Sequence, residues 1–413
     1  MSKKKVLIFI PTFPVLTETF IEREVSQLAK SDKLDLVVVS MKKGSGVLSE
    51  ASEKVTSYQR LDREHFLKGF SYIFKRPAKV LKAFSLVWKN PNRSIFGTLY
   101  LFLKSLGYAK IFEEHSPDII YSHFMSESST ICLIASKVLG VELAIAGHAK
   151  DVLQVGSRFK SENSELVAEK AKNAKFVVVC NKNACKRVME TCGAENSDNI
   201  KLLYHGINAK ELLEQLKAAP SVKKPKKPVI FFVGRFVEKK GIKYLVEASK
   251  VLKDRGFDHL VYMAVGEGPL YSEIKRQIES SDLKGVVKIL GGGKGVKFSE
   301  ILSYFKIADL FVFPGVKDKK GDTDGVPNVL IESALLGIPT VATDSGSITD
   351  FISHNKSALI VRQRDPKGLA AAMEKVLKDE KLQKKLVEGA HKKALEMFNL
   401  KNNVSEVEEL LLK

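Results

Sequence analysis

The stretch GDTDGVPNVLIESALLGIPTV, residues 321–341, places a glycine-rich loop, a helix and a strand in succession. The helix is expected to end at Gly337, because glycine is the residue most often found just past a helix C-terminus. A short apolar strand then begins at Thr340. This order is typical of one repeating unit of a parallel α/β sheet, in which strands alternate with helices.

Short apolar runs rich in β-branched residues recur along the chain. They are continuous rather than alternating, as expected of parallel strands that are buried on both faces. Helical patterns lie between them, such as Tyr244, Leu245, Ala248, Val251 and Leu252 on one helix face. Ligand sites in such sheets lie at the carboxyl ends of the strands. The predicted strands are Val6–Ile10, Leu36–Val39, Asp118–Tyr121, Phe176–Cys180, Val229–Val233, Leu260–Val265, Asp309–Phe313, Thr340–Ala342 and Ala358–Val361.

The length of 413 residues predicts two domains at roughly 150 residues each, or at most three. A stretch rich in proline and lysine, residues 218–228, is the clearest linker. We therefore predict two Rossmann-like domains that face each other across a cleft, an α/β fold. The N-terminal domain would span residues 1–217 and the C-terminal domain residues 229–395. Residues 396–413 would form a last amphipathic helix that needs a surface on one of the two domains, with the N-terminal domain as the candidate.

Two carboxylates and two cations are candidate ligand-binding groups. Asp324 lies at the helix entrance and Glu332 about two turns into the helix, so both could face one ligand, beside the exposed N–H groups of the helix start. The alternative makes Asp324 an N-cap and Glu332 a solvated residue. Arg235 ends the first strand of the second domain and Lys240 precedes the next helix. A guanidinium and an ammonium there suit a diphosphate, although basic residues are common in this chain.

These motifs, in this order, resemble the retaining glycosyltransferases of the GT-B fold, specifically glycosyltransferase family 4. The G-R-x-x-x-x-K-G element reads Gly234-Arg235 with Lys240-Gly241, and the G-x-G-P turn lies at residues 266–269. The E-x(7)-E motif reads Asp324 with Glu332, so its first acid is one methylene shorter here. In the first half, residues 13–20, 122–124, 147–151 and 205–208 resemble the subgroup that builds bacterial exopolysaccharides and colanic-acid-type polymers.

The resemblance implies roles for individual residues. Arg235 and Lys240 would hold the diphosphate of the donor, and Glu332 the ribose hydroxyls. Asp324, with the backbone at Gly325 and Val326, would contact the sugar. His148 would approach the donor sugar at the reacting centre, and His123 is a weaker candidate because a histidine after a strand is more often structural. The implied chemistry is front-face transfer, in which the leaving phosphate helps to take the proton of the acceptor.

Neither a cofactor nor a metal is expected. The G-x-G-P turn lacks the full G-x-G-x-x-G, which argues against NAD. Asp322-Thr323-Asp324 matches the D-x-D metal signature of the other major glycosyltransferase fold, and we interpret it as coincidence. Cys180, Cys185 and Cys192 fit no zinc spacing, and they favour core packing. Four cysteines in this length also argue against a disulfide framework and for a reducing compartment.

The net charge of +19 predicts an anionic partner. Residues 65–110 carry nine basic residues, ten aromatic residues and neither Asp nor Glu. We predict that this stretch binds anionic membranes reversibly, because no apolar run approaches the roughly 20 residues of a spanning helix. The alternative is that its aromatic residues form the core of two or three helices, with the lysines as their solvated face.

Three functions remain in competition. The first is transfer of a hexose or N-acetylhexosamine from a nucleotide diphosphate sugar to a lipid-linked saccharide, by a cytoplasmic enzyme attached peripherally to the inner face of the cell membrane. The second is a glycolipid synthase whose acceptor is a membrane lipid itself. The third, a nucleic-acid-binding protein, is allowed by the positive charge, but the chain carries no recognisable recognition element. Nucleic acid is therefore not an expected partner.

Overall fold

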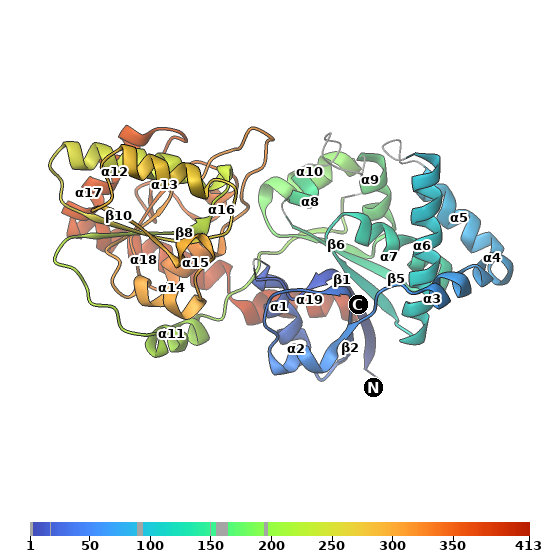
Figure 1. Ribbon diagram of the computed structural model, residues 1–413. Helices are drawn as coiled ribbons and strands as arrows, with labels where there is room; N and C mark the ends of the chain where they lie inside the picture. The colour runs from blue at the N-terminus through green and yellow to red at the C-terminus, as the bar shows by residue number, and fades with distance from the viewer. Residues whose placement is uncertain (1–2, 17, 89–93, 149, 154–163, 194–196) are drawn as a thin grey trace. The chain divides into compact units, whose positions relative to one another are not determined.

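The computed structural model describes residues 3–413 except 17, 89–93, 149, 154–163 and 194–196 (Figure 1). The chain divides into two compact units. Unit 1 comprises Met1–Gly206 with Leu400–Lys413, and unit 2 comprises Ile207–Asn399. The division falls before residues 209–218, whereas the sequence suggests a break after them. This helix belongs to unit 2 because the Lys306 ammonium donates to the carbonyls of Lys217 and Ala219 at its end.

Unit 1 is built on a seven-stranded parallel sheet in the order β3-β2-β1-β4-β5-β6-β7. Its central strand β1 is apolar and buried from Val6 to Ile10, and Ile8 pairs with Val38 on one side and Tyr121 on the other. The strands are β1 Lys4–Phe13, β2 Leu34–Lys43, β3 Thr56–Tyr58, β4 Ile119–His123, β5 Glu142–Gly147, β6 Phe176–Val179 and β7 Ile200–Leu202.

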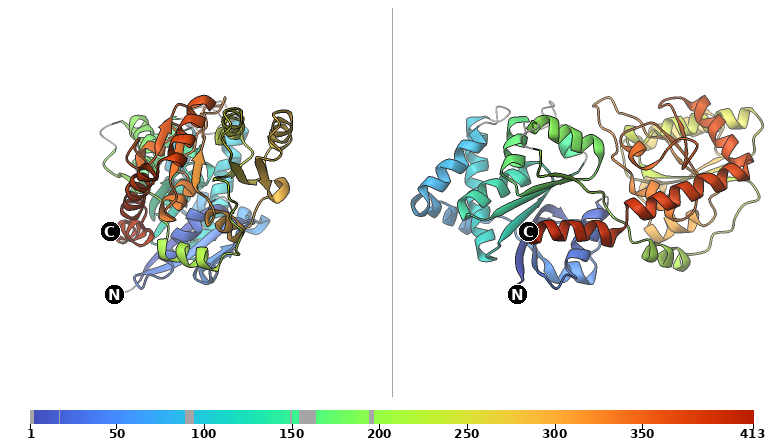
Figure 2. Two further views of the ribbon diagram at one scale, coloured as in Figure 1. Left: turned by 90° about the vertical axis from the view of Figure 1, so that its left-hand side faces the viewer. Right: turned by 180° about the vertical axis from the view of Figure 1, so that it is seen from behind.

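Helices cover both faces of this sheet and enclose two hydrophobic cores. The C-terminal helix α19 contributes Val404, Val407 and Leu411 to the core that also holds residues of α1. In Figure 2, α19 lies at the red end of the colour scale beside the blue N-terminal part of unit 1. The helices are α1 Thr19–Leu28, α2 Glu50–Val55, α3 Arg63–Gly69, α4 Ser71–Lys75, α5 Pro77–Trp88, α6 Ile95–Glu114, α7 Glu127–Leu139, α8 Lys150–Leu153, α9 Ser164–Asn173, α10 Lys182–Cys192 and α19 Leu400–Leu412.

Helix α6 differs from what the sequence predicts. By length and composition it could cross a membrane, although the sequence suggests that no segment approaches that limit. More than half of it is buried in unit 1, where residues such as Leu101, Phe102 and Phe112 belong to the core. A helix in the core of a globular protein can have the same length and apolar composition. Packing in the core therefore explains the length and apolar character of α6.

Unit 2 has a six-stranded parallel sheet in the order β10-β9-β8-β11-β12-β13. The strands are β8 Val229–Arg235, β9 Leu260–Gly266, β10 Val287–Leu290, β11 Leu310–Phe313, β12 Thr340–Thr343 and β13 Leu359–Val361. The helices are α11 Ala209–Ala218, the 3₁₀ turn η2 Glu238–Lys240, α12 Ile242–Asp254, α13 Tyr271–Ser280, η3 Gly291–Gly293, α14 Phe298–Phe305, α15 Asn328–Leu335, α16 Ile348–Phe351, α17 Pro366–Lys378 and α18 Glu380–Met397.

Each of the nine predicted strands overlaps an observed strand, and the predicted α/β class is confirmed. The sequence missed β3, β5, β7 and β10. β3, β7 and β10 are short strands at the sheet edges, where fewer side chains are buried and long apolar runs are not needed. The fourth, β5, is central but reads Glu-Leu-Ala-Ile-Ala-Gly, and its alanines weaken the β-branched signal.

Candidate active site

The first cluster of unit 2 lies beyond the end of β8. Arg235 is the last residue of this strand and is exposed, and η2 follows it directly. Gly241 then has φ of 65°, and a Cβ atom built on it would lie 1.8 Å from the carbonyl oxygen of Pro314. Only glycine allows this approach. The turn therefore packs against the chain leaving β11, which brings Lys240 to the carboxyl ends of two neighbouring strands.

Two lysines of η2 meet two carboxylates of the loop before α15. The Lys240 ammonium lies 2.7 Å from Asp324, and that of Lys239 lies 3.4 Å from Asp324 and 3.2 Å from Asp322. Burial would raise the pKa of Asp324, but Lys240 and Lys239 outweigh it and hold that pKa below its usual value. Burial would lower the pKa of Lys239, and the two carboxylates raise it instead. This cluster is charged and compact.

The loop that carries Asp324 is held from its other side. Gly346 has φ of 62°, and a Cβ atom there would lie 2.0 Å from the carbonyl oxygen of Asp324. The backbone N–H of Ser347 donates to the same oxygen at 3.3 Å. Gly325 and Val326 follow as half-buried residues. Asp324 is therefore an ion-pair partner and not an N-cap, because Pro327 occupies the N-cap position of α15.

Glu332 lies in the second turn of α15 and is 5% exposed. The suggestion that it is a solvated helix residue is therefore wrong. Most of this helix is buried, from Leu330 to Leu335, and Gly337 follows it with φ of 72°. A buried carboxylate is costly without polar partners. Its position on a helix that begins just after the Asp324 loop places it in the same part of unit 2.

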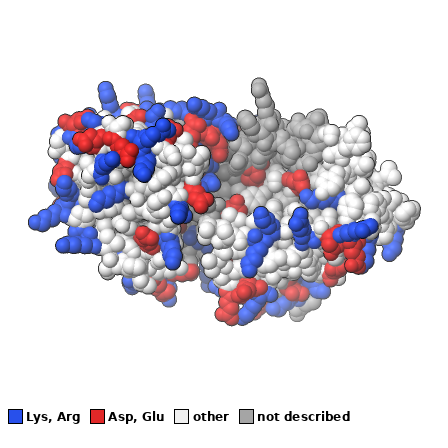
Figure 3. Space-filling model, viewed as in Figure 1, with Lys and Arg blue, Asp and Glu red and all other residues white. Residues whose placement is uncertain are grey.

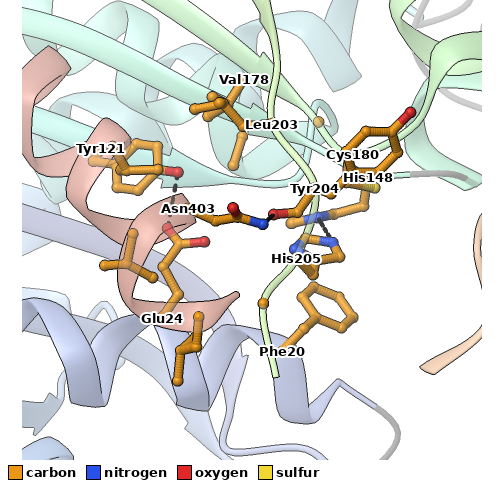
Figure 4. Close-up of a pocket in the computed structure, with 16 residues that line it drawn as sticks. Phe20, Glu24, Tyr121, His148, Val178, Cys180, Leu203, Tyr204, His205 and Asn403 are labelled. Atoms are coloured by element: carbon orange, nitrogen blue, oxygen red, sulfur yellow. Dashed lines mark hydrogen bonds between the residues drawn. The ribbon is translucent and has the colours of Figure 1, made fainter. Parts of the chain in front are cut away.

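Unit 1 holds a second cluster, a chain of three imidazoles, two of which, His148 and His205, are drawn in Figure 4. His123 and His148 are buried, and His205 is half-buried. His123 ends β4 and His148 follows β5, and their Nδ1 and Nε2 atoms lie 3.3 Å apart. His148 Nδ1 in turn lies 3.3 Å from Nε2 of His205. Asp151 fixes the turn after β5, because its carboxylate accepts from the backbone N–H groups of His148 and Met125.

Burial keeps these imidazoles neutral at neutral pH. It lowers the pKa of His148 to about 3 and those of His123 and His205 well below the usual value. A neutral imidazole donates a hydrogen bond from one nitrogen and accepts one at the other. All three imidazoles must therefore donate in the same direction, either from His123 toward His205 or from His205 toward His123. The tautomer of His148 is therefore coupled to those of both neighbours.

Glu24 stands at one end of this chain. Its carboxylate lies 3.7 Å from Nε2 of His123 and accepts the hydroxyl of Tyr121 at 2.9 Å. Burial raises the pKa of Glu24 to about 7, although the hydrogen bond from Tyr121 opposes that rise. An ionised Glu24 favours a proton on Nε2 of His123, and a protonated Glu24 allows the opposite direction. The charge of Glu24 is thus linked to the proton order of the three histidines.

Comparisons with known proteins relate part of the chain to a family. The family model of glycosyl transferases group 1 matches residues 214–393. The solved structure of Anabaena Alr3699/HepE in complex with UDP superimposes with a TM-score of 0.70 over 99% of both chains, at 16% identity. Residues 214–393, less than half of the chain, thus resemble the group 1 glycosyltransferases, and the chain has the GT-B fold. The amylovoran biosynthesis glycosyltransferase AmsK of Erwinia amylovora is 33% identical to this chain over 144 residues, 35% of this chain and 34% of AmsK.

A second relative is WcaL of Escherichia coli strain K12, which its name assigns provisionally to colanic acid biosynthesis. It is 34% identical over 151 residues, 36% of either protein. The aligned part of the chain thus spans about a third of the length of these curated relatives. The matched family model covers the first cluster, from η2 to α15, whereas the imidazole chain of unit 1 lies outside it.

The structure brings the predicted site residues into two groups. Lys240 and Asp324 form an ion pair in unit 2, and His123 and His148 are hydrogen-bonded in unit 1. The sequence missed Glu24 altogether. Lys239, Asp322 and His205 belong to motifs that the sequence marks, but they received no binding role. No spacing rule could have found Glu24, because its only signal is a glutamate on the buried face of α1.

Among the described residues, His148, Cys180 and His205 form a group whose ligand atoms lie within 4.8 Å of one another. The imidazoles of this group already hydrogen-bond to each other, and burial raises the pKa of the Cys180 thiol to about 12, which disfavours the thiolate that metals prefer. Cys185 and Cys192 are part of the core, as predicted. The carboxylates of the D-x-D motif are each paired with a lysine.

Proposed function

We propose that this protein transfers a hexose or N-acetylhexosamine, with retention, from a nucleotide diphosphate sugar to a lipid-linked saccharide in bacterial surface polysaccharide synthesis. The observation that supports it most is the cluster of Lys239 and Lys240 with Asp322 and Asp324 at the strand ends of the family-matched unit. AmsK, a relative, is named for amylovoran biosynthesis, and WcaL for colanic acid biosynthesis. The Anabaena structure contains UDP and was also solved with UDP-glucose, which makes a uridine nucleotide the first donor to test.

In this proposal, the donor diphosphate is held by Arg235 and Lys240. Because Lys240 is paired with Asp324, binding the diphosphate exchanges one anionic partner for another, and Asp324 is released toward the sugar together with the backbone of Gly325 and Val326. Glu332 receives the ribose hydroxyls. The cations also stabilise the charge that develops on the leaving nucleotide, as preorganised groups do in a desolvated site.

His148 contacts the transferred sugar, and His123 is a positioning residue that acts through His148. The hydrogen bond of 3.3 Å between them restricts both the orientation and the tautomer of His148. The leaving phosphate helps to take the acceptor proton, so no carboxylate nucleophile is needed. His123 therefore has a structural and a chemical role together.

A glycolipid synthase is the second candidate. It uses the same donor site and differs only in accepting a membrane lipid directly. Either acceptor lies at a membrane, so we propose a cytoplasmic protein attached peripherally to the inner face. The pairing of basic residues such as Lys240 and Lys104 with carboxylates does not favour nucleic acid as a partner.

Nucleotide release from UDP-glucose, UDP-N-acetylglucosamine and GDP-mannose tests the donor class directly. We expect release from one of them to rise with added membrane extract and to persist in excess chelator, because lysine and arginine already neutralise the phosphates. Loss of activity with chelator, restored by Mn²⁺ and abolished by Asp322→Ala, would show that the D-x-D motif binds a metal. Release from none of the donors would contradict the proposal.

Calorimetry with the free nucleotide diphosphate should separate the two carboxylates. We expect Glu332→Gln to weaken binding by about 10-fold, the loss of one charge-assisted hydrogen bond of roughly 1.5 kcal/mol. Asp324→Asn should weaken it less, because it also frees Lys240 from an ion pair. Equal losses in the two variants would mean that their roles are wrongly divided.

A further inference from the structure

Unit 1 exposes an unusual amount of apolar surface on α3 to α6. Most of the exposed large apolar side chains among the described residues lie between Leu67 and Tyr100. Phe74 and Phe96 are each 84% exposed. In Figure 3, the right-hand end of the molecule, where α4 and α5 lie in Figure 1, shows mainly uncharged surface, with basic and acidic side chains along its lower border. We call this set the apolar patch: Leu67, Ile73, Phe74, Leu81, Trp88, Ile95, Phe96, Leu99 and Tyr100.

Helix α5 shows why the patch needs a partner. Val80, Ala83 and Val87 are buried against the rest of unit 1, while Leu81 and Trp88 on the other side are exposed. A helix that is apolar on both sides is normally buried on both sides. Large exposed apolar patches mark interaction surfaces. The exposed side of α5 thus carries Leu81 and Trp88 among polar residues such as Lys79 and Lys82.

The structure sorts the aromatic residues of 65–110. Tyr72, Phe102 and Tyr108 are buried, so the alternative that this stretch supplies a helical core is correct for them. Phe74, Trp88, Phe96 and Tyr100 are exposed. Trp88 packs on Phe84, which contacts Phe102 of α6, so the exposed and buried rings are continuous. The core thereby holds the exposed rings in place.

The cations of the stretch divide in the same way. Lys68, Arg76, Lys104 and Lys110 are paired with carboxylates, which lie outside the stretch or in adjoining parts of the helices. Lys75, Lys79 and Lys82 are exposed and form no ion pair with any residue that the structure describes. Two more, Lys89 and Arg93, lie outside the described residues. Three available lysines therefore border α4 and α5 beside the apolar patch.

We propose that the apolar patch and these three lysines form a docking surface for an anionic lipid bilayer. Aromatic and aliphatic side chains would enter the headgroup boundary, where Trp and Tyr are favoured, and the lysines would meet lipid phosphates. Charge complementarity favours a bilayer over a second copy of this basic chain, whose own lysines would be repelled. The proposal rests on the proposed function only in explaining why a transferase with a lipid-linked acceptor would carry such a surface.

Vesicle co-sedimentation of the full chain tests this surface. Vesicles of phosphatidylglycerol and phosphatidylcholine should bind the protein, and vesicles of phosphatidylcholine alone should bind it far less. Binding should fall as salt rises. Lys75→Gln, Lys79→Gln and Lys82→Gln together should reduce the partition coefficient by about fivefold per lysine at low salt. Phe74→Ser with Phe96→Ser should reduce it at least 10-fold at any salt.

Matched controls make the test specific to this surface. Val47 is 82% exposed in unit 1 but lies outside the patch, so Val47→Ser should not change binding. Lys381, Lys384 and Lys385 are exposed on α18 of unit 2. Their replacement by Gln removes the same charge as the patch triple variant and should reduce binding much less. Equal effects of the two triple variants would show non-specific attraction and overturn the proposal.

Two further outcomes would also overturn it. The wild-type protein could fail to bind anionic vesicles, or light scattering could show a dimer that Phe74→Ser with Phe96→Ser dissociates, in which case a second copy covers the patch. Nucleotide release from the donor, measured without membranes, separates the two proposals. If the wild-type protein turns over the donor but does not bind anionic vesicles, only the docking surface is rejected. If it binds the vesicles but does not turn over any donor, only the transferase is rejected.

Discussion

Replacing Lys240 or Arg235 with alanine should lower kcat/KM for the sugar donor by about 10- to 100-fold while leaving the protein folded. Each substitution removes charge-assisted hydrogen bonds worth roughly 1.5–3 kcal/mol. The loss should be larger for Lys240, because it is mostly buried and a desolvated charge interacts more strongly with a phosphate. Donor turnover in each variant, beside thermal unfolding as a check on folding, measures the effect.

Lys243→Ala is the matched control. Lys243 lies in the first turn of α12, close to Lys240 in sequence, but its side chain is 55% exposed. It removes the same charge from the same region and should leave turnover within about twofold of wild type. If Arg235→Ala and Lys240→Ala behave like this control, the assignment of the diphosphate to these residues is wrong.

Glu24→Gln should stabilise unit 1 at pH 8 by about 3 kcal/mol, and this advantage should vanish by pH 4. Burial raises the pKa of Glu24 from 4.5 to about 7. The folded state therefore holds a proton that the unfolded state has released, and the stability this provides is complete below pH 4.5 and lost as the pH rises to 7. Each pH unit in that window costs about 1.4 kcal/mol. The amide still accepts the hydroxyl of Tyr121 without the cost of burying a charge.

Urea unfolding at several pH values measures this difference. Trp88 is the only tryptophan and lies in unit 1, so its fluorescence reports the unfolding of that unit. The buried histidines act in the opposite direction, because their lowered pKa values destabilise the fold in acid. This contribution of the histidines is the same in the wild-type protein and in the Glu24→Gln variant. Glu396→Gln on the exposed side of α18 should change the unfolding free energy by less than about 0.5 kcal/mol at any pH. If the difference in unfolding free energy between Glu24→Gln and the wild-type protein does not change with pH, the raised pKa of Glu24 is wrong.

The sequence predicted the strands of both sheets where apolar runs are long, because a parallel strand buried on two faces must be apolar throughout. It also marked Lys240, Asp324, His123 and His148 through their places at strand and helix ends. It could not predict β5, since its alanines satisfy burial without a β-branched signal. Nor could it find Lys239 or Glu24, whose neighbours are distant along the chain.

The amino-acid sequence by itself therefore determined the α/β class, the alternation of elements and the residue types that reach the strand ends. These follow from local periodicity and from turn chemistry. Only the tertiary structure decided which groups meet: Asp324 with Lys240, the three imidazoles with one another, and α19 with the core of unit 1. It also decided which aromatic residues between Phe66 and Tyr108 face the core and which face outward. Contacts between distant segments depend on how helices and strands pack. The hydrophobic effect favours the burial of an apolar side chain on either side of a helix, so only the packing decides which side faces the core.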